Sequence, residues 1–133
     1  MFFDEEMLLD LRLNIMDKYV DKFVITEATY MHSGRPKKLL FDINKYSKFK
    51  DKIIYKVIDK EPSDIESIYE EDKDEKDTRG QKLVNNSNKR EHYQRNMAEE
   101  SLKILSEADA EDIILINDID EIPNLDKINF KEI

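Results

Sequence analysis

Apolar positions in the first part of the chain follow two different periods. Over residues 5–18 they recur at helical spacing and predict a broadly apolar helix. Residues 19–26 and 52–59 are instead rich in β-branched and aromatic side chains, which predicts two buried strands. Phe2 and Phe3 indicate the end of a further, short strand. Strands and helices are therefore expected to alternate from the start of the chain.

The segment between the two predicted strands contains a loop and a helical stretch. Gly34 and Pro36 interrupt both periods and predict a loop over residues 32–38. Residues 41–50 place apolar and aromatic side chains at helical spacing. We therefore expect a helix between the two strands.

The stretch over residues 61–90 has few large apolar residues, none of them periodic, and dense charge of both signs. This composition predicts a long mobile loop. The loop would separate two blocks that are each too short to form a core alone. We therefore expect one domain that spans residues 1–133.

The last part of the chain predicts one more helix and one more strand. Residues 91–106 can share apolar faces in a helix, and residues 112–117 (DIILIN) form the clearest buried strand pattern in the chain. Alternating strands and helices predict an α/β fold with a mostly parallel sheet flanked by helices. Ligands bind beyond the carboxyl ends of strands in such sheets. The residues at the expected strand ends are all acidic: Asp4, Glu5, Glu27, Asp59, Asp118 and Asp120.

Composition narrows the chemistry that these acids can perform. The 133 residues include two glycines, no cysteine and two histidines, with 22 Lys and Arg against 31 Asp and Glu for a net charge of −9. Two isolated glycines exclude a glycine-rich phosphate loop, and the absence of cysteine excludes thiolate metal sites and disulfides. The acidic balance argues against a nucleic-acid surface. A metal, if used, would be a hard cation on carboxylates.

Asp118 and Asp120 form a D-x-D pair directly after the last predicted strand. In an extended segment, residues two apart point the same way, so both carboxylates can meet one divalent cation. Mg²⁺ or Mn²⁺ held in this way keeps open positions for the oxygens of a diphosphate. The alternative is a solvated turn that ends at Pro123, because acidic pairs are common in so acidic a chain.

Five segments resemble, in order, a known family. They are residues 2–13, 20–41, 52–59, 91–96 and 112–123, and their most specific parts are VDKFVITEATYMHSGRPK and DIDEIP. Together they resemble the N-terminal half of glycosyltransferase family 17, the β-1,4-mannosyl-glycoprotein β-1,4-N-acetylglucosaminyltransferase family. The resemblance implies a GT-A-like, Rossmann-like fold. It also implies transfer of N-acetylglucosamine from UDP-GlcNAc to a glycan acceptor, with inversion and with help from Mn²⁺ or Mg²⁺.

The resemblance also assigns roles to residues. Asp118 and Asp120 match the D-x-D that binds the metal and the donor diphosphate. Arg95 and Asn96 match the Q-R-N segment of the family. Arg95 would meet the diphosphate or hold the acidic cluster, and Asn96 would contact the ribose. The alternative for this segment is a salt bridge at a helix N-terminus.

Four further residues are candidates at the same sheet edge. Glu27 matches an acid that faces the nucleoside in GT-A folds, and Glu5 occupies the equivalent place after the first strand. Lys37 would pair with phosphate, and His32 would hydrogen-bond sugar hydroxyls. The alternatives are an edge-of-sheet carboxylate for Glu27 and contacts that order the loop for His32 and Lys37.

The chain also departs from the family pattern. Only residues 1–3 represent the first strand, and 13 residues follow Asp120 (133 − 120). The acceptor site and the catalytic carboxylate, which stays unassigned, are expected after the D-x-D strand. We therefore expect a donor-side fragment, incomplete at its C-terminus, without robust transferase activity of its own.

The cellular compartment of the chain is predicted from weaker features of the sequence. No apolar run approaches the ~20 residues of a membrane span, and no signal peptide is visible. These features favour a soluble, cytoplasmic chain, whereas family members that modify glycoproteins are anchored in membranes of the secretory pathway.

Two other functions compete with the transferase. One is a non-catalytic acidic α/β module that binds a nucleotide sugar, or a partner through residues 61–90. The other is a D-x-D phosphatase-like fragment. It is the weaker of the two, because such enzymes need later catalytic groups and 15 residues follow Asp118 (133 − 118).

Overall fold

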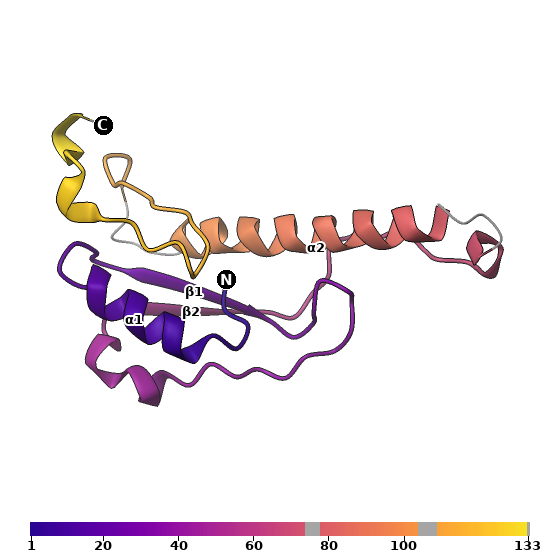
Figure 1. The fold of residues 1–133 in the computed structure, drawn as a ribbon, viewed down its shortest axis with the longest axis horizontal. Helices are drawn as coiled ribbons and strands as arrows, with labels where there is room; N and C mark the ends of the chain where they lie inside the picture. The colour runs from indigo at the N-terminus through magenta and orange to yellow at the C-terminus, as the bar shows by residue number, and fades with distance from the viewer. Residues whose placement is uncertain (74–77, 104–108, 133) are drawn as a thin grey trace.

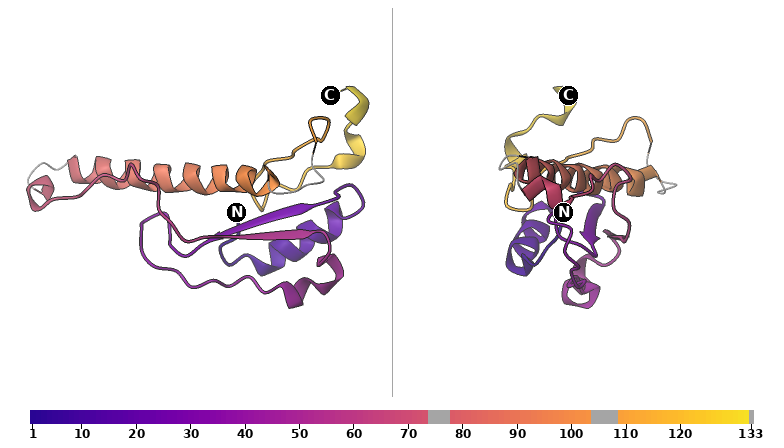
Figure 2. Two further views of the ribbon diagram at one scale, coloured as in Figure 1. Left: turned by 180° about the vertical axis from the view of Figure 1, so that it is seen from behind. Right: turned by 90° about the vertical axis from the view of Figure 1, so that its right-hand side faces the viewer.

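The computed structural model describes residues 1–73, 78–103 and 109–132. Its helices and strands are α1 (Glu6–Met16), β1 (Phe23–Ala28), β2 (Ile53–Ile58) and α2 (Thr78–Lys103), with short 3-10 helices η1 (Ile43–Phe49), η2 (Glu70–Lys73), η3 (Leu125–Lys127) and η4 (Phe130–Glu132). In Figures 1 and 2, α2 lies along one side of the two strands, and α1 and η1 lie on the other. The α/β class is confirmed, while a GT-A-like arrangement stays a prediction.

The two strands pair in parallel, from Phe23 with Ile53 to Ala28 with Ile58. Both were predicted, but β1 begins four residues later than expected. The reason is a turn after α1, in which the Tyr19 amide donates to the Met16 carbonyl at 2.9 Å. Among the described residues these two strands form the whole sheet.

The predicted helix over residues 5–18 is confirmed as α1, and its buried side chains face β1. Successive residues of a strand point to opposite faces, so Phe23 and Ile25 of β1 meet α1. The main core has these members: Phe2, Leu9, Leu13, Met16, Phe23, Ile25, Tyr46, Phe49 and Leu125. The predicted helix over residues 41–50 is a 3-10 helix instead, which begins where the Asn44 amide donates to the Asp42 carboxylate at 2.9 Å.

The even-numbered face of β1 meets α2. Ala28 and Ile58 form a second small cluster with Tyr30, against which Tyr93 and Met97 of α2 pack. The buried residues of α2 are nevertheless all polar: Asn86, Arg90, Gln94 and Ser101. Their spacing of four, four and seven places them on one helical face.

The loop prediction for residues 61–90 is therefore wrong from Thr78 onward, where α2 begins. Hydrophobic periodicity could not reveal this helix, because the face that it buries carries amide, guanidinium and hydroxyl groups. The predicted helix over residues 91–106 is confirmed as far as Lys103, where it forms the second half of α2. Residues 104–106 lie outside the described residues.

The polar face of α2 binds the segment that precedes it. The Asn86 side chain accepts from the Glu66 amide and donates to the Glu66 carbonyl, both at 2.8 Å. Lys82 pairs with Asp72 at 2.8 Å, and Lys89 pairs with Glu66 at 2.9 Å. These four charged side chains are thus paired within the chain, and partner binding through residues 61–90 stays a prediction.

The predicted buried strand over residues 112–117 is wrong. This segment has no regular structure, and its four large apolar side chains are 45% to 74% exposed: Ile113, Ile114, Leu115 and Ile116. Strand propensity is realised only against a neighbouring strand, and neither described strand pairs with this segment. Phe2 likewise forms no strand, although its amide donates to the Thr26 carbonyl of β1 at 2.8 Å.

Two further expectations concern the chain as a whole. A single domain over residues 1–133 stays a prediction. No helix within the described ranges is long and apolar enough to cross a membrane.

Asn86→Ala tests whether the polar face of α2 holds residues 61–73. The substitution leaves the amide and carbonyl of Glu66 without their partner, so we expect the free energy of unfolding to fall by about 2 kcal/mol. Asn88→Ala, at an exposed position of the same helix, should change stability by less than about 0.5 kcal/mol. Urea unfolding followed by circular dichroism measures both, and equal losses would contradict the fold.

Candidate functional site

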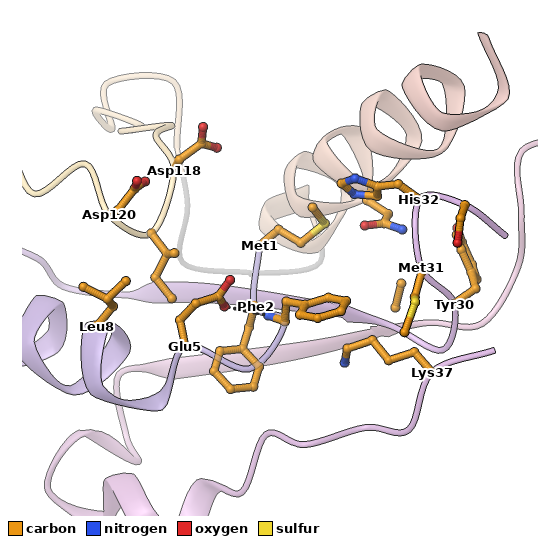
Figure 3. A pocket seen from close by; sticks show the side chains of 15 residues that line it. Met1, Phe2, Glu5, Leu8, Tyr30, Met31, His32, Lys37, Asp118 and Asp120 are labelled. Carbon is orange, nitrogen blue, oxygen red and sulfur yellow. Dashed lines mark hydrogen bonds between the residues drawn. The ribbon is translucent and has the colours of Figure 1, made fainter. Parts of the chain in front are cut away.

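A pocket of about 650 Å³ opens beside the N-terminal end of α1, the segment after β1 and the middle of α2. Its volume lies in the range of small-molecule sites. Fifteen side chains line it (Figure 3). Those with polar or titratable groups are Glu5, Tyr30, His32, Ser33, Lys37, Gln94, Asp118 and Asp120. Five of the candidate residues therefore share one cavity: Glu5, His32, Lys37, Asp118 and Asp120.

The D-x-D pair lies in a turn and not at the end of a strand. The Glu121 amide donates to the Asp118 carbonyl at 3.1 Å, and the Asp118 amide donates to the Glu121 carboxylate at 3.2 Å. Both aspartates are exposed, and Figure 3 shows them next to each other on one side of the pocket. The turn predicted as the alternative is therefore present, and its carboxylates still reach the cavity.

Arg12 of α1 holds this turn through hydrogen bonds. Its guanidinium donates to the carbonyls of Asp118 and Glu121, both at 2.9 Å, and to the side chain of Asn117. Ile119 packs against the main core from the same turn. Sequence reasoning missed Arg12, although it is the only basic residue of α1.

Arg95 of α2 holds the same turn from the other side. Its guanidinium pairs with the Asp118 carboxylate at 2.9 Å and with Glu91, four residues earlier, at 3.2 Å. The structure thus places Arg95 at the acidic pair, as its predicted role of holding the acidic cluster requires. Contact between Arg95 and a diphosphate stays a prediction. Asn96 is exposed and is not among the residues that line the pocket, so its contact with a ribose stays a prediction.

Glu27 is fully buried, at 0% exposure, and does not line the pocket. Its carboxylate accepts from the Lys37 ammonium, the Leu40 and Phe41 amides at 2.8 and 3.0 Å, and the Tyr55 hydroxyl at 2.8 Å. Burial alone would raise the pKa of Glu27, but these hydrogen bonds outweigh it and leave the pKa below its usual value. Burial, and then the bond to Glu27, raises the pKa of Tyr55.

Lys37 lines the pocket, yet its ammonium group is engaged inside the protein. It pairs with Glu27, donates to the Lys38 carbonyl at 3.1 Å and is only 6% exposed. The geometry therefore supports internal ordering for Glu27 and Lys37. Their contacts with a nucleoside and a phosphate stay predictions that the geometry does not support.

His32 lies on the pocket wall across from the two aspartates (Figure 3). The loop that carries it is fixed by Arg90 of α2, which donates to the His32 carbonyl at 3.1 Å and pairs with Glu61 at 2.8 Å. Gly34 makes this contact possible. Its φ of +82° is strained for other residues, and a Cβ there would lie 2.6 Å from the Arg90 guanidinium.

The carboxylates of Asp118 and Asp120 could serve only a metal site that has few protein ligands. Among the residues that the structure describes, no three Asp, Glu or His side chains gather closely enough for a metal cage. Mg²⁺ is usually held by one or two protein carboxylates, with water and phosphate oxygens filling the rest of its shell. Asp118 and Asp120 could supply the two carboxylates of such a site, and a cation shared with a diphosphate stays a prediction.

Glu27→Gln tests the buried ion pair. Because the variant leaves the Lys37 ammonium buried without a counter-charge, we expect a loss of about 3 kcal/mol at pH 7. The pKa of Glu27 is lowered in the folded state, so its stabilisation is present above the unfolded pKa of about 4.3 and is lost as pH falls through the folded pKa. Urea unfolding at pH 7 and at about pH 3.5 should show the difference from wild type shrinking.

Glu99→Gln is the matched control, since Glu99 forms an exposed pair with Lys103 at 3.0 Å. It should cost about 0.5 kcal/mol or less. A Glu27→Gln loss as small as this, or one that does not change with pH, would show that the buried pair does not stabilise the fold.

The comparisons with known proteins identify the family of the chain. The family model described as "Glycosyltransferase family 17" matches residues 1–132. No curated protein and no solved structure matches the chain. The match includes both aspartates of the turn and every other residue that lines the pocket. The chain belongs to glycosyltransferase family 17.

Proposed function

We propose that this glycosyltransferase-family chain binds UDP-GlcNAc in the pocket beside Asp118 and Asp120, with Mn²⁺ or Mg²⁺. The transferase that uses this site would move N-acetylglucosamine to a glycan acceptor with inversion. One observation carries the proposal: two exposed carboxylates lie side by side on the wall of a ligand-sized pocket, in a turn that both long helices hold.

The charges around the pocket favour a metal over a basic side chain as the partner of a diphosphate. Lys37 is neutralised by Glu27, and Arg95 is bound to Asp118 and Glu91. The lining keeps three carboxylates, those of Glu5, Asp118 and Asp120, against the N-terminal ammonium of Met1, and this negative balance would repel an anion. When bound, the cation supplies a Lewis acid that neutralises charge on the diphosphate as it leaves.

The protein's own residues would place the reacting groups. Arg12 holds the backbone of the turn that carries the two carboxylates before a ligand arrives, and a preformed geometry favours reaction. Arg95 holds the side chain of Asp118 from α2. His32, on the opposite wall, would hydrogen-bond hydroxyl groups of the ligand.

Calorimetry with UDP-GlcNAc, with and without Mn²⁺, tests the proposal. We expect binding that depends on the metal, and at least tenfold weaker binding in Asp118→Asn and in Asp120→Asn, because an amide cannot replace a charged oxygen ligand. Asp21→Asn, at an exposed turn position, is the matched control and should bind as wild type does.

Each contrary result has a distinct meaning. Binding that is equal without metal would refute the metal site alone. No binding by a chain that circular dichroism shows to be folded would refute the donor site as a whole.

A further inference from the structure

The guanidinium of Arg95 lies between two carboxylates that belong to different parts of the chain. It pairs with Glu91, one turn earlier on α2, at 3.2 Å and with Asp118 of the pocket at 2.9 Å. Within the described ranges this is the one ion pair that either Asp118 or Asp120 forms. One of the two carboxylates proposed to hold a metal ion is therefore already paired with a cation of the protein.

The pair between Arg95 and Asp118 reduces repulsion within the acidic turn. Asp118 and Asp120 lie next to each other (Figure 3), and the Glu121 carboxylate accepts from the Asp118 amide at 3.2 Å. Like charges at such a site disfavour one another. Arg12 gives its hydrogen bonds in this turn to two backbone carbonyls and to an asparagine side chain. In the described part of the chain, Arg95 is thus the side chain that pairs with a carboxylate of the turn.

A metal ion at Asp118 would compete with Arg95. Both are cations, and an ion that approaches this carboxylate meets a guanidinium 2.9 Å from one of its oxygens. The pair is exposed, with 42% of the Arg95 side chain and 58% of the Asp118 side chain accessible. Exposed ion pairs are weak, so a divalent ion can replace the guanidinium.

Glu91 gives the guanidinium a partner that does not depend on the pocket. Glu91 and Arg95 are four residues apart on α2, a spacing at which opposite charges on a helix surface attract. Glu91 is not among the residues that line the pocket. Arg95 can therefore leave Asp118 without losing every counter-charge.

We propose that Arg95 competes with the metal ion for Asp118 and is retained by Glu91 when the ion binds. The inference rests on the proposed function, because the ion concerned is the cation of the donor site. Arg95 is then a positioning residue: it neutralises Asp118 in the empty pocket and lowers the affinity of the site for the ion.

Two substitutions with opposite expected effects test the proposal. Arg95→Gln removes the competing cation, so Mn²⁺ alone should bind about threefold more tightly than to wild type, the effect of one exposed ion pair. Glu91→Gln removes the alternative partner and should weaken Mn²⁺ binding about twofold. In the Arg95→Gln background, Glu91→Gln should have no further effect, because Glu91 acts through Arg95. Electron paramagnetic resonance of free Mn²⁺, titrated into the full chain without nucleotide, measures all four affinities.

Melting temperatures separate competition from a purely structural role. Without its counter-charge the acidic turn is less stable, and the tighter-binding ion should restore more of that stability. Saturating Mn²⁺ should therefore raise the melting temperature of Arg95→Gln by more than that of wild type, whereas a purely structural role predicts equal increases. Arg79→Gln, at an exposed position of the same helix, is the matched control and should bind Mn²⁺ as wild type does.

Three results would overturn the inference and leave the donor site intact, provided that wild type still binds UDP-GlcNAc with Mn²⁺. The first is Mn²⁺ binding by Arg95→Gln that is equal to wild type or weaker. The second is an effect of Glu91→Gln that is absent, or that is the same with and without Arg95. The third is no binding of Mn²⁺ alone by either wild type or Arg95→Gln. No metal-dependent binding of UDP-GlcNAc by the folded wild type would overturn the inference together with the proposed function.

Discussion

The carboxylate of Glu27 joins three parts of the chain that would otherwise be linked only through the backbone. It sits in β1, accepts the Tyr55 hydroxyl from β2, and accepts Lys37 and two amides from the connection between the strands. A buried charge is tolerated only when it is paired and fully hydrogen-bonded. The position of the whole connection, including the pocket residue Lys37, follows from satisfying this one group.

The same requirement explains α2. The buried residues of this helix are all polar, although the same helix leaves Leu83 and Val84 exposed. Asn86 and Arg90 on that face are matched by groups of the Glu66 backbone, Glu61 and the His32 loop. Gln94, on the same face, lines the pocket.

The ion pairs inside the protein determine which charges the pocket presents to a ligand. Lys37 is engaged by Glu27 and Arg95 by Asp118, and the carboxylates of Asp118 and Asp120 are among the exposed groups of the pocket. This charge pattern is the reason why the proposed ligand is one that arrives with a metal ion. Because Arg12 and Arg95 reach the D-x-D turn from different helices, the geometry of the site depends on how α1 and α2 pack around the sheet.

The sequence by itself determined α1, both strands, their α/β class and the D-x-D pair, because each is encoded by local periodicity or by residues two positions apart. It did not reveal the first half of α2, since the helix buries polar residues whose partners are distant in the chain. It also placed residues 112–117 in a strand, because propensity does not say whether a neighbouring strand is present. Only the tertiary structure decided that Glu27 faces inward, that Arg12 and Arg95 hold the acidic turn, and that Gln94 faces the cavity. These roles depend on which groups pair after folding, and that is a property of contacts between distant segments.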